Sequence, residues 1–144
     1  MKLLKLILIA SIAMGSVCAK EKFFVVEIES ESLATIYDGL KRTNIEGMHN
    51  MNHGVVKFDG KDGYVISRDG YVVKFDPISE KILAEYKTSK SAIGFVIGAN
   101  YVAVANYDDK SVDILDRDLK PIDKIETNSK NVGIKIYTDY LIFS

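Results

Sequence analysis

Apolar and polar residues alternate in short runs along most of this 144-residue chain, and turn residues separate the runs. Residues 55–76, "VVKFDGKDGYVISRDGYVVKFD", alternate, turn at Asp-Gly, alternate again and turn once more at Arg-Asp-Gly. A period of two is that of a β-strand with one buried side, and these runs are rich in the strand-favouring residues Val, Ile, Tyr and Phe. The predicted strands are residues 25–29, 55–59, 64–67, 72–76, 82–87, 93–97, 101–105, 112–116, 122–125 and 132–137.

No stretch shows a convincing helical period. The nearest is "ESLATIYDGLKR", residues 31–42, but Thr-Ile-Tyr followed by Asp-Gly suits a strand and a turn better. Residues 44–54, "NIEGMHNMNHG", lack periodicity and are expected to form a loop. The sequence therefore predicts an all-β fold.

The strands recur with a period of about 40 residues. When residues 71–104 are laid over residues 111–144, Phe75 falls on Leu115 and Ile82 falls on Ile122. Four short antiparallel strands in about 40 residues make one blade of a β-propeller. A meander or sandwich with chance similarity is the alternative.

About two and a half such blades fit into residues 20–144, whereas known propellers close with four or more. We therefore expect this region to be the N-terminal part of a longer propeller domain, truncated here. An incomplete ring of this kind leaves an unpaired sheet edge.

The charge is balanced, with 19 basic and 20 acidic residues and a formal net charge of −1. No block of like charge offers the basic face that phosphate neutralisation needs, so a nucleic-acid partner is not expected.

No activated nucleophile, phosphate-binding loop or carboxylate pair stands out. The aspartates lie at turns and strand ends, where we expect them to cap backbone amides; they are Asp59, Asp62, Asp69, Asp76, Asp108, Asp109 and Asp116.

Residues 1–19, "MKLLKLILIASIAMGSVCA", have the pattern of a signal peptide: two early lysines, an apolar run and small residues before a cut after Ala19. The apolar run in this segment is well short of the roughly 20 residues that a membrane span needs. No membrane span is therefore expected in the chain once the signal peptide is removed. The prediction is export to the periplasm. Lipid attachment at Cys18, the only cysteine, is an alternative, and the mature chain would have no disulfide and no Cys-x-x-Cys-His heme attachment.

His53 and Arg68 are the candidate site residues. Neighbouring strands of a blade reverse direction, so the start of the first strand and the turn between the second and third lie on one rim. His53 precedes the strand at 55–59 and Arg68 lies in the turn after 64–67, so we expect both there. The next repeats place Ser91, Asn106 with Tyr107, and Asn131 on the same rim.

An imidazole beside a guanidinium suits a planar metal macrocycle that carries carboxylates, because the ring nitrogen can bind iron and Arg can pair with carboxylates. The plainer interpretation is a surface histidine and an arginine that braces its turn. His49, four residues before His53, leaves open a two-histidine metal site.

The sequence resembles the heme d1 domain family. The segments that carry the resemblance are His53 with "VVKF", then "YVISRDG" and "KFD", and later "YVAVANY" and "VDILD". The similarity runs from about residue 25 to 116 and is strongest from 53 to 107, whereas "TNIEGMHNM" before His53 departs from the pattern. The resemblance implies an eight-bladed β-propeller that binds heme d1 or its dihydro precursor.

The resemblance also implies roles for four residues. His53 matches the proximal ligand of the heme iron, Arg68 matches an arginine that contacts the macrocycle's carboxylates, and Asn106 and Tyr107 match a corner that lines the same pocket. It assigns no catalytic residue.

Two branches of the family differ in whether they carry a cytochrome c domain through which electrons enter. The cytochrome cd1 nitrite reductases carry a cytochrome c domain with Cys-x-x-Cys-His, a motif that these 144 residues lack. The resemblance therefore favours the branch of the F protein of the nitrite-reductase cluster, which acts late in heme d1 biosynthesis for dissimilatory nitrite reduction (denitrification). It implies an oxidoreductase of the dihydro-heme d1 dehydrogenase type that turns a propionate into an acrylate, with a c-type cytochrome or nitrite reductase as partner. The alternatives are a non-catalytic propeller or cofactor carrier, and a fragment of a cytochrome cd1-type nitrite reductase.

Overall fold

The computed structural model describes residues 21–38, 40–137 and 140–143, so the predicted signal peptide and Cys18 lie outside it. The described residues form strands and turns and no helix. The strands are β1 (Lys22–Glu27), β2 (Ser32–Tyr37), β3 (Lys41–Ile45), β4 (Val55–Asp59), β5 (Asp62–Ile66), β6 (Tyr71–Asp76), β7 (Lys81–Lys87), β8 (Ala92–Ile97), β9 (Tyr101–Asn106), β10 (Ser111–Asp116), β11 (Pro121–Glu126), β12 (Ile134–Tyr137) and β13 (Tyr140–Phe143).

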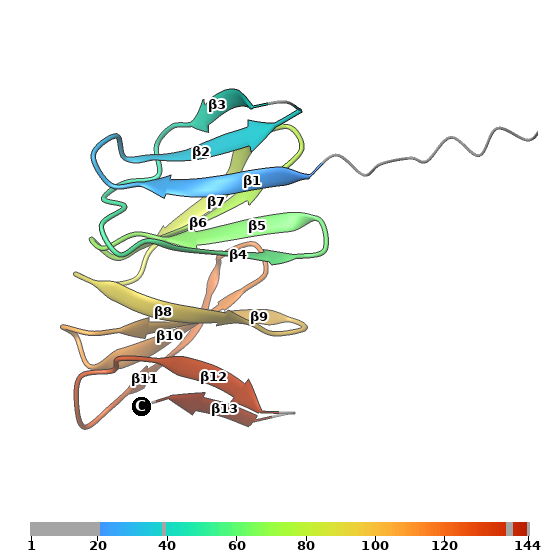
Figure 1. The fold of residues 1–144 in the computed structure, drawn as a ribbon. Coiled ribbons are helices and arrows are strands. Elements are labelled where there is room, and N and C mark those ends of the chain that lie inside the picture. The colour runs from blue at the N-terminus through green and yellow to red at the C-terminus, as the bar shows by residue number, and fades with distance from the viewer. Residues whose placement is uncertain (1–20, 39, 138–139, 144) are drawn as a thin grey trace, which may run out of the picture.

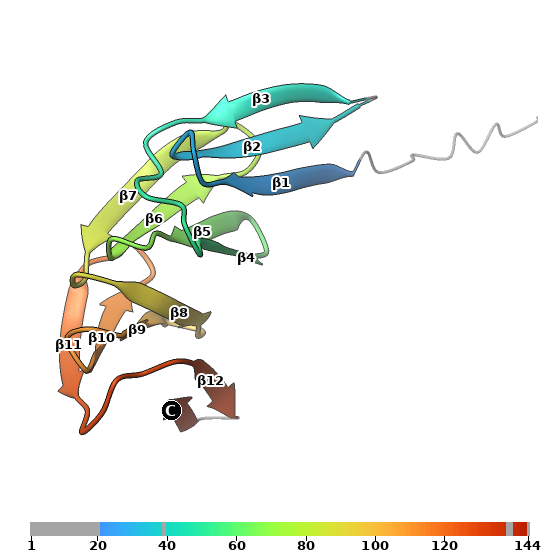
Figure 2. The same cartoon turned by 60° about the vertical axis from the view of Figure 1, so that its left-hand side comes forward.

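The strands form four antiparallel sheets in chain order: β1 to β3, β4 to β7, β8 to β11, and β12 with β13. Within each sheet, consecutive strands are neighbours, so each is a meander. The sheets lie side by side (Figure 1) and fan along an open arc (Figure 2). The predicted all-β fold with four-stranded antiparallel blades in an incomplete ring is confirmed.

The second and third sheets repeat each other in detail. Their pairing shifts register at the same point of the blade, between Lys74 and Phe75 in one and between Ile114 and Leu115 in the other. These positions are 40 residues apart, as the sequence overlay predicts.

The aspartates follow the prediction of turn capping only in part. Asp76 accepts a hydrogen bond from the Ile78 amide at 2.8 Å, and Asp116 accepts one from the Asp118 amide at 2.9 Å. Asp59 and Asp62 instead form ion pairs with Arg117 and Lys74 of other strands and turns. The sequence shows that a turn is acidic but not which basic side chain packs over it.

The core lies between the sheets. One cluster joins the first sheet to the second, a larger cluster joins the second to the third, and a third cluster joins the third sheet to β12. Phe75 and Tyr64 are fully buried in the first two of these layers. Burying a side chain of this size contributes about 1.5–3 kcal/mol, so contacts between blades carry much of the stability.

The first sheet has three strands, and β1 occupies the position that the second strand has in the four-stranded sheets. Phe24 and Val26 of β1 pack toward the second sheet, just as Tyr64 and Ile66 of β5, 40 residues later, pack toward the third. β1 also contacts β4 in the way that β5 contacts β8. No strand of the described residues occupies the innermost place beside β1.

Strand β3 was not predicted. Its residues, "KRTNI", are polar except the last, and only Ile45 is buried. An outermost strand needs few apolar residues because it contacts the core along one edge, so the alternation that reveals inner strands is missing. The described part of the chain also contains no helix of the length and apolarity that a membrane crossing requires.

Candidate functional site

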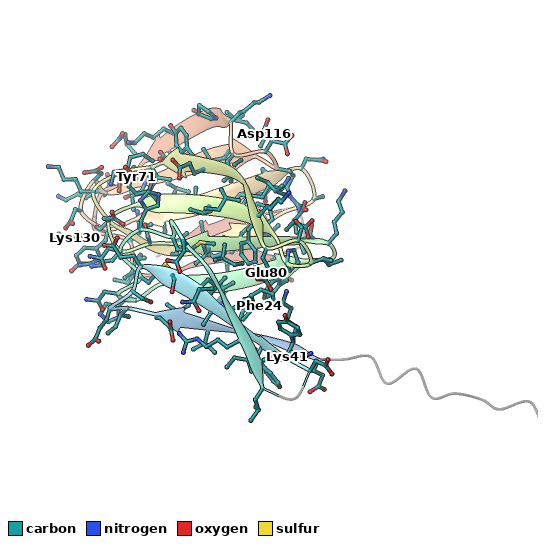
Figure 3. The ribbon with its side chains drawn as sticks, turned by 90° about the horizontal axis from the view of Figure 1, so that it is seen from above. Phe24, Lys41, Tyr71, Glu80, Asp116 and Lys130 are labelled. Carbon is teal, nitrogen blue, oxygen red and sulfur yellow. The ribbon has the colours of Figure 1, made fainter. Side chains whose placement is uncertain are left out.

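Four side chains line an open hollow of about 190 Å³ at one end of the second and third sheets: His53, Arg68, Ile93 and Tyr107. His53 comes from the loop before β4, Arg68 from the turn between β5 and β6, Ile93 from β8, and Tyr107 from the turn after β9. We call this end of the sheets the site rim. Figure 3 shows two of its residues, Tyr71 and Lys130, on one side of the molecule and Glu80 and Lys41 on the other, which is the opposite rim.

His53 projects from a tight turn. Its backbone has φ of 58°, in the left-handed region, and the Gly54 amide donates a hydrogen bond to the Met51 carbonyl at 2.8 Å. Met51 is fully buried, whereas His53 is exposed. The loop is therefore held from the core side, and the imidazole remains accessible at the rim.

Arg68 is held by its backbone. Its amide donates to the Asn50 carbonyl at 2.7 Å, and the turn closes through the Gly70 amide and the Ser67 carbonyl at 3.0 Å. Among the described residues, its guanidinium makes no hydrogen bond and no ion pair within 4 Å. A cationic group with five donors thus faces the hollow, and none of these donors is hydrogen-bonded within the described part of the chain.

Tyr107 forms the other wall of the hollow, and Asp108 follows it in the same turn. The Tyr107 amide donates to the Ser91 carbonyl at 3.0 Å, and the Lys130 ammonium lies 4.4 Å from the centre of the Tyr107 ring. A hydrogen bond from the Ser91 hydroxyl, with the positive charges of Lys130 and Arg68, lowers the pKa of Asp108 below its ordinary range. Asp108 is therefore ionised at neutral pH, close to Arg68.

Asn106 does not line the hollow. It is fully buried at the end of β9, its amide nitrogen donates to the Ser111 hydroxyl at 3.1 Å, and its side-chain oxygen has no hydrogen-bond partner in the described part of the chain. Asn131, also on this rim, donates to the Asn106 carbonyl at 3.3 Å. The structure thus brings together His53, Arg68 and Tyr107 and separates Asn106 from them; the roles of all four in binding a cofactor stay predictions.

His49 belongs to a different contact. Its ring stacks on Tyr71 with centroids 3.6 Å apart and an interplanar angle of 5°, and its Nε2 lies 3.1 Å from a Glu85 oxygen. It does not line the hollow. Within the described residues, no group of three or more His, Cys, Asp and Glu side chains could hold a metal ion.

The residues of the hollow fit the edge of an iron macrocycle with carboxylate substituents. An imidazole nitrogen can bind the iron, an unpaired guanidinium can bind a carboxylate with two hydrogen bonds, and Ile93 and Tyr107 offer apolar surface to a ring. Pockets that enclose a whole ligand usually measure 300–1,000 Å³, so this hollow would cover only part of such a molecule. Sequence reasoning missed Ile93, which no motif marks.

The sequence matches the cytochrome d1 heme domain family over residues 18–135. The chain belongs to this family. No curated protein sequence matches the chain.

Solved structures resemble the fold. The dihydro-heme d1 dehydrogenase NirN, in complex with DHE, is 25% identical with a TM-score of 0.65, and the match covers 78% of this chain and 27% of NirN. BamB from Moraxella catarrhalis is 18% identical with a TM-score of 0.64, covering 85% of this chain and 37% of BamB. AztD from Citrobacter koseri is 15% identical with a TM-score of 0.59, covering 71% and 31%. BamB and AztD share the fold alone, and the chain spans between 27% and 37% of the length of these three proteins.

Proposed function

We propose that this chain is part of a periplasmic β-propeller that binds dihydro-heme d1 and acts late in heme d1 biosynthesis, as the F-protein branch of the family does. The observation that carries the proposal is the hollow lined by both His53 and Arg68, in a chain of the cytochrome d1 heme domain family. The likeness to a dihydro-heme d1 dehydrogenase supports the choice of ligand. The proposed location follows from the signal-peptide pattern of residues 1–19.

In this proposal, His53 binds the iron through a neutral ring nitrogen, and Arg68 holds a carboxylate of the macrocycle. Ile93 and Tyr107 would offer apolar surface to the macrocycle. The negative charge of Asp108 lies close enough to interact with the Arg68 guanidinium. These residues bind and orient the substrate.

The proposed reaction is the oxidation of a propionate side chain to an acrylate. Forming the carbon–carbon double bond removes two electrons and two protons, so an electron acceptor is required. A c-type cytochrome is the proposed acceptor, with two one-electron transfers for each double bond and both protons released to solvent, and nitrite reductase is the proposed recipient of the finished heme d1.

A non-catalytic heme d1 carrier is the second candidate. It is favoured by the make-up of the hollow, where the four lining residues include one group for iron, one for a carboxylate and no carboxylate base. To separate the candidates, the full-length protein would be incubated with dihydro-heme d1 and an oxidised c-type cytochrome. Conversion to the acrylate product supports the enzyme, whereas binding without conversion supports the carrier.

Binding itself is tested with the visible spectrum of the full-length protein in complex with heme d1 or its dihydro precursor. His53→Ala should lose the bands of histidine-ligated iron, and added imidazole should restore them. Asn52→Ala is the matched control, since Asn52 is exposed in the same loop and does not line the hollow. A spectrum that His53→Ala leaves unchanged would remove His53 as the ligand and the proposal with it.

A further inference from the structure

The loop that carries His53 is fixed at several points. Residues 46–54 connect β3 to β4, and Met48 and Met51 within them are fully buried in the core between the first and second sheets. The Met48 amide also donates to the Glu31 carbonyl at 3.1 Å. The two buried methionines, three residues apart, hold the core-facing side of the loop in place. The positions of the His49 and His53 side chains then depend on contacts at the site rim.

A pair of hydrogen bonds ties this loop to the turn that carries Arg68. The Arg68 amide donates to the Asn50 carbonyl at 2.7 Å, and the Asn50 amide donates to the Asp69 carboxylate at 3.3 Å. The same Asp69 oxygen accepts from the Ser67 hydroxyl at 2.7 Å. Asp69 thus joins both sides of Arg68's turn to a residue three positions before His53.

A stacked ring pair makes a second tie. His49 lies flat on Tyr71, the residue that follows the Arg68 turn, and its Nε2 lies 3.1 Å from Glu85 on β7. The Lys87 ammonium is 4.4 Å from the centre of the same Tyr71 ring. The loop is therefore attached to β6 and β7 as well as to the turn, so a shift of the loop would break contacts at both places.

Binding a metal macrocycle at two points requires a fixed separation between the two binding groups. Productive geometry is held within about 0.5 Å when the supporting side chains are themselves locked by packing and hydrogen bonds. The residues that provide this support lie in "TNIEGMHNM", residues 43–51, and in the turn it contacts. The support is thus built from this chain's own residues.

We infer that Asp69 and His49 are positioning residues that tie the loop of residues 46–54 to the Arg68 turn and so set the imidazole of His53 against the guanidinium of Arg68. This inference rests on the proposed function, because a fixed separation of the two side chains matters only if they bind one ligand. The tie itself is a property of the ligand-free fold and can be tested without the ligand.

The first test measures hydrogen exchange at the Arg68 amide in the ligand-free full-length protein. Asp69→Ala and His49→Asn should each speed this exchange about tenfold, since the Arg68 amide is bonded to the loop that they hold. Asp69→Asn, which keeps a side-chain oxygen as acceptor, should retain most of the protection, and Asp109→Ala is a control carboxylate on the same rim. Exchange within twofold of wild type in both Asp69→Ala and His49→Asn overturns the inference, provided that circular dichroism shows both variants folded.

The second test uses the heme d1 complex. Added imidazole should displace His53 from the iron at about tenfold lower concentration in Asp69→Ala and His49→Asn than in wild type. A wild-type spectrum that does not depend on His53 contradicts the proposed function and leaves the exchange result to decide the tie. A wild-type spectrum that does depend on His53, with unchanged displacement in both variants, overturns the positioning role alone.

Discussion

The two rims of the sheets use the same residue types in opposite ways. On the opposite rim, the Arg117 guanidinium lies 3.2 Å from the Tyr64 hydroxyl, donates to the Gly98 carbonyl at 2.8 Å and pairs with Asp59. On the site rim, the Arg68 guanidinium has no such partner among the described residues and faces a hollow. An arginine whose donors are satisfied braces neighbouring blades, whereas one left unpaired is free to bind a ligand.

The same contrast holds for other charged groups of the opposite rim. Lys74 is almost fully buried and pairs with Asp118 at 2.8 Å and with Asp62 at 3.4 Å. Its burial alone would lower its pKa, but the bonds to these carboxylates outweigh that effect and raise it, so Lys74 stays charged. The Lys74–Asp118 and Arg117–Asp59 pairs join the second sheet to the third, whereas the Lys74–Asp62 pair lies within the second sheet, so charge pairs on the opposite rim help to hold these two sheets together.

The largest effect is expected at the glycine of the Arg68 turn. An added Cβ at Gly70 would lie 2.2 Å from the Ser89 carbonyl oxygen, and its backbone has φ of +86°. We expect Gly70→Ala to lower the free energy of unfolding by about 3 kcal/mol, because strained backbone and a clash with a fixed carbonyl add together. Urea unfolding of the full-length protein measures this loss.

The control lies on the opposite rim. Gly60 has φ of +58° with no atom within 4 Å of an added Cβ, so Gly60→Ala should cost only about 1 kcal/mol. Equal losses in the two variants would show that the turn of the site rim is not closely packed.

The two arginines should separate stability from binding. Arg117→Gln removes several hydrogen bonds of a charged group and should lower the free energy of unfolding by about 2 kcal/mol. Arg68→Gln should change stability by less than about 0.5 kcal/mol and weaken heme d1 binding by roughly 10- to 100-fold. Urea unfolding and a spectroscopic binding titration on each variant test the contrast, and a loss of stability in Arg68→Gln as large as in Arg117→Gln would contradict it.

Acid should weaken the opposite rim through Glu80. Burial alone would raise the pKa of Glu80, but hydrogen bonds from Lys22, Thr43 and Thr35 outweigh it and lower the pKa. A carboxyl group with a lowered folded-state pKa stabilises the fold fully above its unfolded pKa, about 4.3, and loses this contribution as pH falls through the folded value. Glu80→Gln should therefore cost about 1 kcal/mol at neutral pH and flatten the loss of stability below about pH 4.

Urea unfolding from pH 7 to pH 3 tests this dependence. Glu126→Gln is the control, since Glu126 is exposed on β11. If Glu80→Gln and wild type lose stability in parallel as the pH falls, Glu80 is not the group responsible.

The smallest effect is expected for Lys130. Its ammonium lies 3.6 Å from Asp108, and both side chains are about half exposed. Exposed pairs of this kind contribute little, so Lys130→Ala should change the free energy of unfolding by less than about 0.5 kcal/mol. A loss above 1 kcal/mol would show that the site rim is braced by charge pairs after all.

Alternation and turn residues were enough to predict the repeat, because each inner strand has one side on a core. The same reasoning placed His53 and Arg68 on one rim by counting reversals of direction, and the structure has them lining one hollow. It could not place Asn106, since residues 102–106 of β9 are buried on both sides and the alternation that separates inward from outward is absent.

The strand pattern of the sequence did not predict the side-chain contacts between blades. Arg117 reaches Asp59 from 58 residues away, and His49 of the loop before β4 stacks on Tyr71 of β6. Such pairs depend on how the sheets pack, which a strand pattern does not specify. The pairing of Glu80 with Thr35 and Thr43 was missed for the same reason, because the overlay gives equivalent positions and not neighbouring ones.

The left-handed backbone of His53 has a practical consequence for engineering. A side chain with a Cβ costs roughly 1 kcal/mol or more in this conformation, and glycine avoids that cost. If His53 binds iron as proposed, exchanging it for glycine would open a coordination position while sparing the scaffold, and a small base such as a pyridine or a thiolate could then be supplied from solution to tune the iron.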